Sequence, residues 1–164
     1  MTRSFALLRL TLAAAAALLA PAAARAQSAE GSTLVVIVDR DNPKTDISTE
    51  ELRALFLGKK KEWSDGQRAV PLDLEAGSAE RENFNANVLN MDQGEVDRYW
   101  VDQRMRGTGT APRVAPTPES VVRLAGKVRG VVAYVPQRAV DASVKVLKVN
   151  GIAPGKPGYP LSGK

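Results

Sequence analysis

The sequence predicts an α/β domain in which helices flank a mainly parallel sheet. Residues 34–38 and 131–135 are two runs of apolar, mostly β-branched side chains, typical of strands buried on both faces. Segments with helix start signals lie between these runs, and this alternation favours a sheet covered by helices. The length of 164 residues fits one domain, and no internal repeat is present.

Residues 1–26 predict a secretory signal peptide. They combine a basic start, an uncharged apolar run over residues 10–20 and an Ala-Arg-Ala sequence before the expected cleavage after Ala26. The apolar run is short for a membrane span, which disfavours the alternative of an uncleaved anchor. We therefore expect a periplasmic protein that is not membrane-embedded after cleavage. It would have a domain over residues 27–150 and a Gly/Pro-rich C-terminal tail over residues 151–164.

Composition excludes several functions. Removal of the leader takes away three arginines and no acids, so the net charge falls from +5 to +2, and no basic block suggests nucleic acid. The chain has no cysteine and no histidine, which excludes disulfides, thiolate chemistry, the usual general base and the commonest metal ligand. No run has metal-ligand spacing, and the paired acids fit caps and loops. We expect neither an enzyme nor a cofactor or metal site.

The first helix is predicted to begin at Ser48. Ser48 and Glu51 have the spacing of a capping box, and Ile47 and Leu52 that of a hydrophobic staple. Gly58 supplies a left-handed stop after one apolar turn.

A turn at Asp65-Gly66 then separates this helix from a short strand over residues 69–74. Pro71 within that strand implies a position where no N–H is needed. Gly77-Ser78 leads into the next helix, which carries Phe84 on its apolar side.

Two further helices and a strand complete the domain. Asp92 and Glu95 form a second predicted capping box, and Thr117 caps a helix with Pro118 at its first position. Residues 144–149 alternate apolar side chains with lysine, as a half-exposed edge strand does. Beyond this strand the chain is rich in glycine and proline with few apolar anchors, which is typical of a mobile tail.

Several segments together resemble a known family. They are LVVIVDRDNP, TEELRALFLGKKKEW, EAGSAERENF, YWVDQRMRGTGTAPR, GVVAYVP and GYPL. In order and spacing they resemble the solute-binding proteins of phosphate ABC uptake systems, and most of all their short, single-lobe relatives. The resemblance implies a single lobe of a periplasmic-binding-protein-like (type II) fold. It also implies a phosphate or other small oxyanion as ligand, and an ABC permease or another periplasmic protein as partner. The closing Tyr-Pro pair would be a remnant of the passage between two lobes.

The loop before the second helix is the candidate oxyanion site, formed by Gly77, Ser78, Ala79 and Arg81. A serine at a helix start offers a hydroxyl beside free backbone N–H groups and the positive end of the helix dipole. In the family this loop reads serine-glycine-threonine after a strand arginine. Here Ser78 is followed by Ala79 and Glu80, the strand arginine is missing, and Arg81 replaces it only partly.

These departures leave two functions open. Carboxylates at Glu80 and Glu82 repel an anion, and Ser78 is equally explained as a plain N-cap. The first reading is a solute-binding-like protein with weak or altered oxyanion binding. The alternative is a periplasmic interaction or scaffold module that has lost its ligand.

Weaker candidates each have a structural explanation. Residues 59–61 are three lysines that could dock an acidic partner or simply be solvated beside a helix end. Trp63 and Trp100 could stack on a ligand or fill the core. Arg106, Thr108 and Thr110 lie in a loop of the kind that often carries binding groups.

Overall fold

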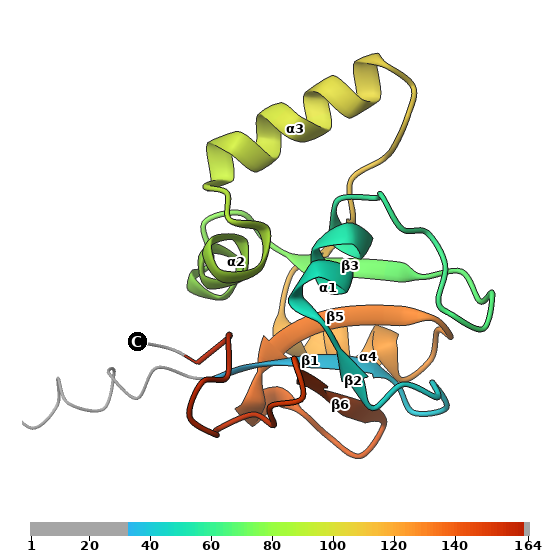
Figure 1. Cartoon of the computed structure of the whole chain (residues 1–164), viewed down its shortest axis with the longest axis vertical. Helices are drawn as coiled ribbons and strands as arrows, with labels where there is room; N and C mark the ends of the chain where they lie inside the picture. Colours follow the sequence, from blue (N-terminus) through green and yellow to red (C-terminus); the bar gives the residue numbers. More distant parts are fainter. Residues whose placement is uncertain (1–32, 163–164) are drawn as a thin grey trace, which may run out of the picture. The chain divides into compact units, whose positions relative to one another are not determined.

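The computed structural model describes residues 33–162. The strands are β1 (Leu34–Asp39), β2 (Asp46–Ile47), β3 (Val70–Leu74), β4 (Arg113–Ala115), β5 (Val131–Pro136) and β6 (Val144–Val149). The helices are α1 (Thr49–Phe56), α2 (Ala79–Phe84), α3 (Gln93–Met105) and α4 (Pro118–Ala125), with a π-helical segment η2 (Asn85–Leu89) and a 3₁₀ turn η3 (Gln137–Ala139) (Figure 1). No helix within residues 33–162 is long and apolar enough to cross a membrane. The predicted signal peptide lies outside the described residues.

The six strands form one mixed sheet in the order β2-β6-β1-β5-β3-β4. β1 lies antiparallel to both β5 and β6, and the other three pairings are parallel. The α/β class with a helix-flanked sheet is therefore confirmed, with more antiparallel pairing than we expected. The reason is that an apolar run indicates a strand buried on both faces, as β1 is. It does not indicate whether the neighbouring strands run parallel or antiparallel to it.

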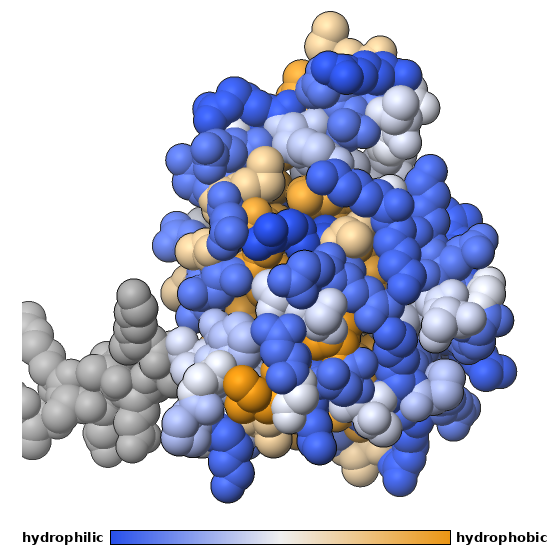
Figure 2. Space-filling model, in the orientation of Figure 1, coloured by the Kyte–Doolittle hydropathy of each residue, from blue (hydrophilic) through white to orange (hydrophobic). Residues whose placement is uncertain are grey.

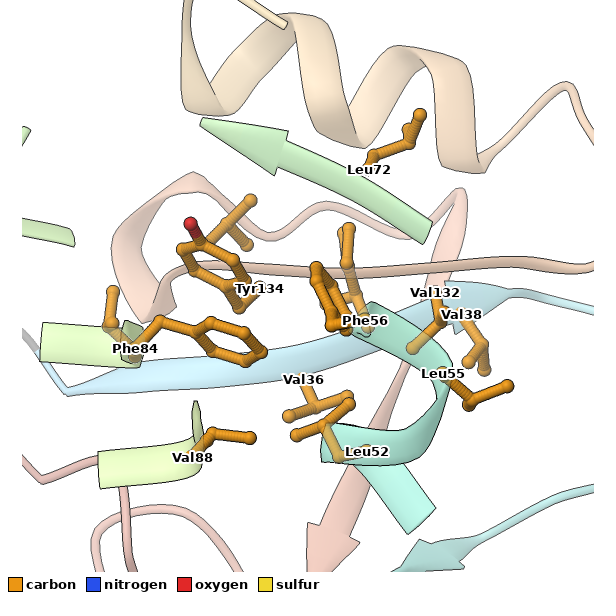
Figure 3. Packing of buried hydrophobic residues seen from close by; sticks show 14 of the residues in the cluster. Val36, Val38, Leu52, Leu55, Phe56, Leu72, Phe84, Val88, Val132 and Tyr134 are labelled. Carbon is orange, nitrogen blue, oxygen red and sulfur yellow. The ribbon is translucent and has the colours of Figure 1, made fainter. Parts of the chain in front are cut away.

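Helices cover the sheet and close the core. α4 packs on β5, β1 and β3, and α2 contacts β3 and β5 (Figure 1). Three aromatic rings meet in the core: Phe84 stacks on Tyr134 with 4.0 Å between centroids, and Phe56 lies 4.6 Å from Phe84 (Figure 3). Such pairs contribute beyond their buried area, at about 0.5–1.5 kcal/mol each.

The predicted helix starts are present, with one correction. The Ser48 hydroxyl accepts a hydrogen bond from the Glu51 N–H at 3.0 Å, and Gly58 adopts a φ of +67° after α1. The capping box is incomplete, however, because the Glu51 carboxylate binds Lys44 and Lys60 instead of returning to the cap. At α3 both halves of the predicted box form.

β6 is not the edge strand that its alternating pattern predicted. Asp46 and Ile47 of β2 pair with its last two residues, Lys148 and Val149, and β1 covers its other side. A strand of two residues leaves no periodic signal in the sequence, so the true edge on this side could not be identified.

The Gly/Pro-rich end is packed rather than mobile up to Ser162. Tyr159 and Leu161 are 3% and 0% exposed, and the Leu161 carbonyl accepts a hydrogen bond from the Leu34 N–H at 3.0 Å. Two well-placed apolar side chains are enough to fix a segment that composition alone describes as a tail.

Candidate functional site

The candidate site lies at the C-terminal ends of β3 and β5, which are parallel neighbours in the sheet. β3 leads through residues 75–78 into α2, and β5 leads into η3. Because adjacent parallel strands end at the same edge, the first turn of α2 and the residues of η3 are brought together. Ligands of open α/β sheets commonly bind outside the carboxyl ends of strands.

Ser78 is the N-cap of α2. Its hydroxyl accepts a hydrogen bond from the Arg81 N–H at 3.2 Å and donates its own proton to the Glu75 carbonyl at 2.8 Å. A serine hydroxyl has one proton, so Ser78 must release Glu75 before it can donate to an anion. The N–H groups of Ala79 and Glu80, in the first turn, have no intrahelical acceptor. They follow a turn in which Gly77 has a φ of +83°.

Arg81 turns back into the protein. Its guanidinium donates to the Leu74 carbonyl at 2.8 Å and forms an ion pair with Asp73 at 3.2 Å, with the arginine side chain only 10% exposed. Its Nε atom is buried without a partner among the described residues. The positive charge of Arg81 is therefore neutralised inside the domain and not offered to a ligand.

Asp73 is the centre of this buried cluster. Burial raises the pKa of Asp73, and the Tyr134 hydroxyl, the Arg81 guanidinium and the Leu74 N–H oppose that rise. Burial and the neighbouring Asp73 carboxylate raise the pKa of Tyr134, so its hydroxyl stays a donor to Asp73. Both residues are buried, and the cluster links the end of β3 to α2.

Arg138 is the cation that sequence reasoning missed. It lies on η3, its side chain is 68% exposed, and its Nη2 is 3.7 Å from Glu80 Oε1 on the first turn of α2. The signal that could have identified it is the parallel pairing of β3 with β5. This pairing places any residue just after β5 beside the start of α2.

Of the four predicted site residues, three gather at the helix start and one does not. Gly77 and Ala79 are exposed and Ser78 is half-buried, whereas Arg81 is buried and faces Asp73. Only the backbone of Arg81 takes part in the first turn of α2, where its N–H donates to the Ser78 hydroxyl.

Five of the weaker candidates are engaged elsewhere. Trp63 and Trp100 are 4% and 7% exposed and belong to the core. Lys60 pairs with Glu51, Arg106 with Asp102 at 3.0 Å, and Thr108 bonds to Gln103. Among residues 33–162 no group of acidic side chains has the arrangement of a metal site.

Comparison with known proteins identifies the fold. No family model matches this sequence. The structure is similar to an ABC-type phosphate transport receptor from Vibrio cholerae, with 19% identity and a TM-score of 0.61 over 74% of this chain and 48% of that one. It is also similar to PstS from Borrelia burgdorferi, with 15% identity and a TM-score of 0.65 over 80% and 55%. A phosphate-binding protein from Stenotrophomonas maltophilia matches with 16% identity and a TM-score of 0.58 over 75% and 40%.

The chain spans about half the length of these structures. It is a single-lobe domain with the fold of phosphate ABC transporter substrate-binding proteins.

Proposed function

We propose that this protein is a periplasmic, solute-binding-like module that takes a small oxyanion weakly at the first turn of α2. The observation that carries the proposal is the pairing of that turn with Arg138. Free N–H groups of Ala79 and Glu80 and a guanidinium lie at the same sheet edge, in a fold shared with phosphate-binding proteins. Because those proteins are named for phosphate transport or binding, phosphate is the first ligand to test.

Arg138 has the role in this proposal that Arg81 had in the sequence prediction. A guanidinium matches a phosphate with two parallel hydrogen bonds, and Arg138 is the exposed one. Its pairing with Glu80 is long, at 3.7 Å, and the arginine side chain is 68% exposed, so we expect an ion pair of small energy that an anion can displace.

Three features make the expected affinity low. The Ser78 proton is already bound to Glu75, the Arg81 charge is neutralised by Asp73, and the Glu80 carboxylate repels the ligand. Each charge-assisted contact that is lost costs about 1.5–3 kcal/mol, or tenfold and more in affinity. We therefore expect a dissociation constant for phosphate of about 100 µM or weaker.

Calorimetric titration of the purified protein with inorganic phosphate, and with sulfate for comparison, tests the proposal. Glu80→Thr should tighten binding by about tenfold, because it removes the repulsion and frees Arg138. Arg138→Ala should weaken binding by a similar factor.

A matched control is available for the arginine. Arg106 has the same 68% side-chain exposure and also pairs with a carboxylate, but it lies on the turn after α3. Arg106→Ala should leave phosphate affinity unchanged. Equal losses in the two arginine variants would mean that phosphate responds only to overall charge, and the proposed site would be wrong.

A further inference from the structure

The ion pair between Asp73 and Arg81 separates an arginine from the proposed oxyanion site. Arg81 belongs to the first turn of α2, where its N–H donates to the Ser78 hydroxyl, so its backbone lies at that site. Its side chain turns the other way, toward the end of β3. There its Nη2 is 3.2 Å from Asp73 Oδ2, and the arginine and aspartate side chains are only 10% and 7% exposed. The pair therefore buries a guanidinium whose backbone begins beside the site.

Asp73 is held in place independently of Arg81. Its other oxygen, Oδ1, accepts hydrogen bonds from the Leu74 N–H at 2.9 Å and from the Tyr134 hydroxyl. The Tyr134 ring is fixed in turn, because it stacks on Phe84 with 4.0 Å between ring centroids (Figure 3). Asp73 therefore presents its Oδ2 atom to Arg81 from a fixed position, as an anion that belongs to the protein itself.

Arg81 is held less completely than Asp73. A guanidinium has five N–H donors. Its side-chain partners among residues 33–162 are Asp73 Oδ2 and the Leu74 carbonyl, which accepts a hydrogen bond from Nη1 at 2.8 Å. The buried Nε–H has no acceptor in the same part of the chain. The Asp73 charge is therefore the main compensation for burying this cation, and a buried ion that loses its partner is strongly destabilised.

We propose that Asp73 determines the affinity of the oxyanion site, because it withholds Arg81 from the ligand. This inference rests on the proposed function. Without the Asp73 charge, the Arg81 guanidinium keeps only the Leu74 carbonyl inside the domain and gains solvation by turning outward. An oxyanion at the site can then pair with Arg81 as well as with Arg138. Two guanidinium groups complement a doubly charged oxyanion such as hydrogen phosphate or sulfate.

Asp73→Asn tests the inference with little change in side-chain shape. The asparagine carbonyl can still accept from Leu74 and Tyr134, but its NH₂ group faces the guanidinium with donors only. In calorimetric titration, inorganic phosphate should bind this variant about tenfold more tightly, the gain of one charge-assisted contact. The double variant Asp73→Asn/Arg81→Gln should lose that gain. Glu50→Gln removes the same charge from the first turn of α1 and is the control, with unchanged affinity expected.

Arginine modification by phenylglyoxal, read by peptide mass spectrometry, tests the same contact without a ligand. In the unmodified protein Arg138 should react and Arg81 should be protected, whereas in folded Asp73→Asn both should react. Equal reactivity of Arg81 and Arg138 in the unmodified protein would overturn the inference even if the variant does not fold.

The two measurements together separate this inference from the proposed function. Tighter phosphate binding with Arg81 still protected would show an effect of charge alone and overturn the inference. Equal phosphate affinity of the unmodified protein and folded Asp73→Asn would overturn the role of Asp73 and leave the oxyanion site standing. Absence of phosphate binding in both proteins would overturn the oxyanion site itself, and with it the inference.

Discussion

Two buried tyrosine hydroxyls have opposite hydrogen-bonding situations. The Tyr134 hydroxyl donates to Asp73, which is already paired with Arg81. The Tyr159 hydroxyl lies near the Val36 backbone without a hydrogen bond to a described residue, and burial raises the pKa of Tyr159 to about 12. The same chemical deletion should therefore have different consequences at the two positions.

We predict that Tyr134→Phe lowers the free energy of unfolding by about 1–3 kcal/mol, because a buried carboxylate loses a donor. Tyr159→Phe should change it by less than about 0.5 kcal/mol or raise it, since no hydrogen bond is lost. Urea denaturation of both variants at pH 7 measures the difference. Equal losses would show that the Asp73 cluster contributes nothing beyond packing.

At the scale of elements, the helix caps could be predicted from the sequence, whereas ion pairs between different elements could not. The caps at Ser48 and Asp92 were predicted correctly because a cap depends on residues within one turn. The ion pair between Arg81 and Asp73 joins a helix to the preceding strand across a loop, so only the folded geometry could reveal it. Arg138 belongs to the same class, because its place beside α2 depends on which strand lies next to β3.

Glu51 connects α1 to two lysines outside the helix. Burial would raise the pKa of Glu51, but its hydrogen bonds with Lys44 and Lys60 and their charges outweigh this and hold the pKa below 4.5. Since the folded-state pKa is lower than the unfolded value, the stabilisation is present above pH 4.5 and is lost as pH falls through the folded-state pKa.

We predict that Glu51→Gln lowers the free energy of unfolding by about 0.5–1 kcal/mol at pH 7. This difference from the unmodified protein should disappear in acid. Urea denaturation across pH 2–7 measures it. Glu50→Gln, an exposed neighbour in the same turn, should have a smaller effect at pH 7. A difference for Glu51→Gln that persists unchanged at pH 2 would contradict the role of its charge.

At the scale of the whole molecule, the chain spans about half the length of the proteins that share its fold. The face of the domain shown in Figure 2 is mostly hydrophilic, with hydrophobic residues in small separate areas. The fold class followed from apolar runs, and the start of α2 at Ser78 followed from its cap signal. The ordering of the chain's end did not, because it rests on two side chains in a segment of glycine and proline.

That end of the domain closes the sheet beside β1. Leu161 is fully buried, and its carbonyl accepts a hydrogen bond from Leu34, the first residue of β1. We predict that Leu161→Ala lowers the free energy of unfolding by about 2–5 kcal/mol, the range for truncating a buried leucine. Ser162→Ala, at the exposed next position, is the control and should change it by less than about 0.5 kcal/mol. Urea denaturation measures both. A loss below about 1 kcal/mol for Leu161→Ala would mean that this segment detaches readily in solution and does not support β1.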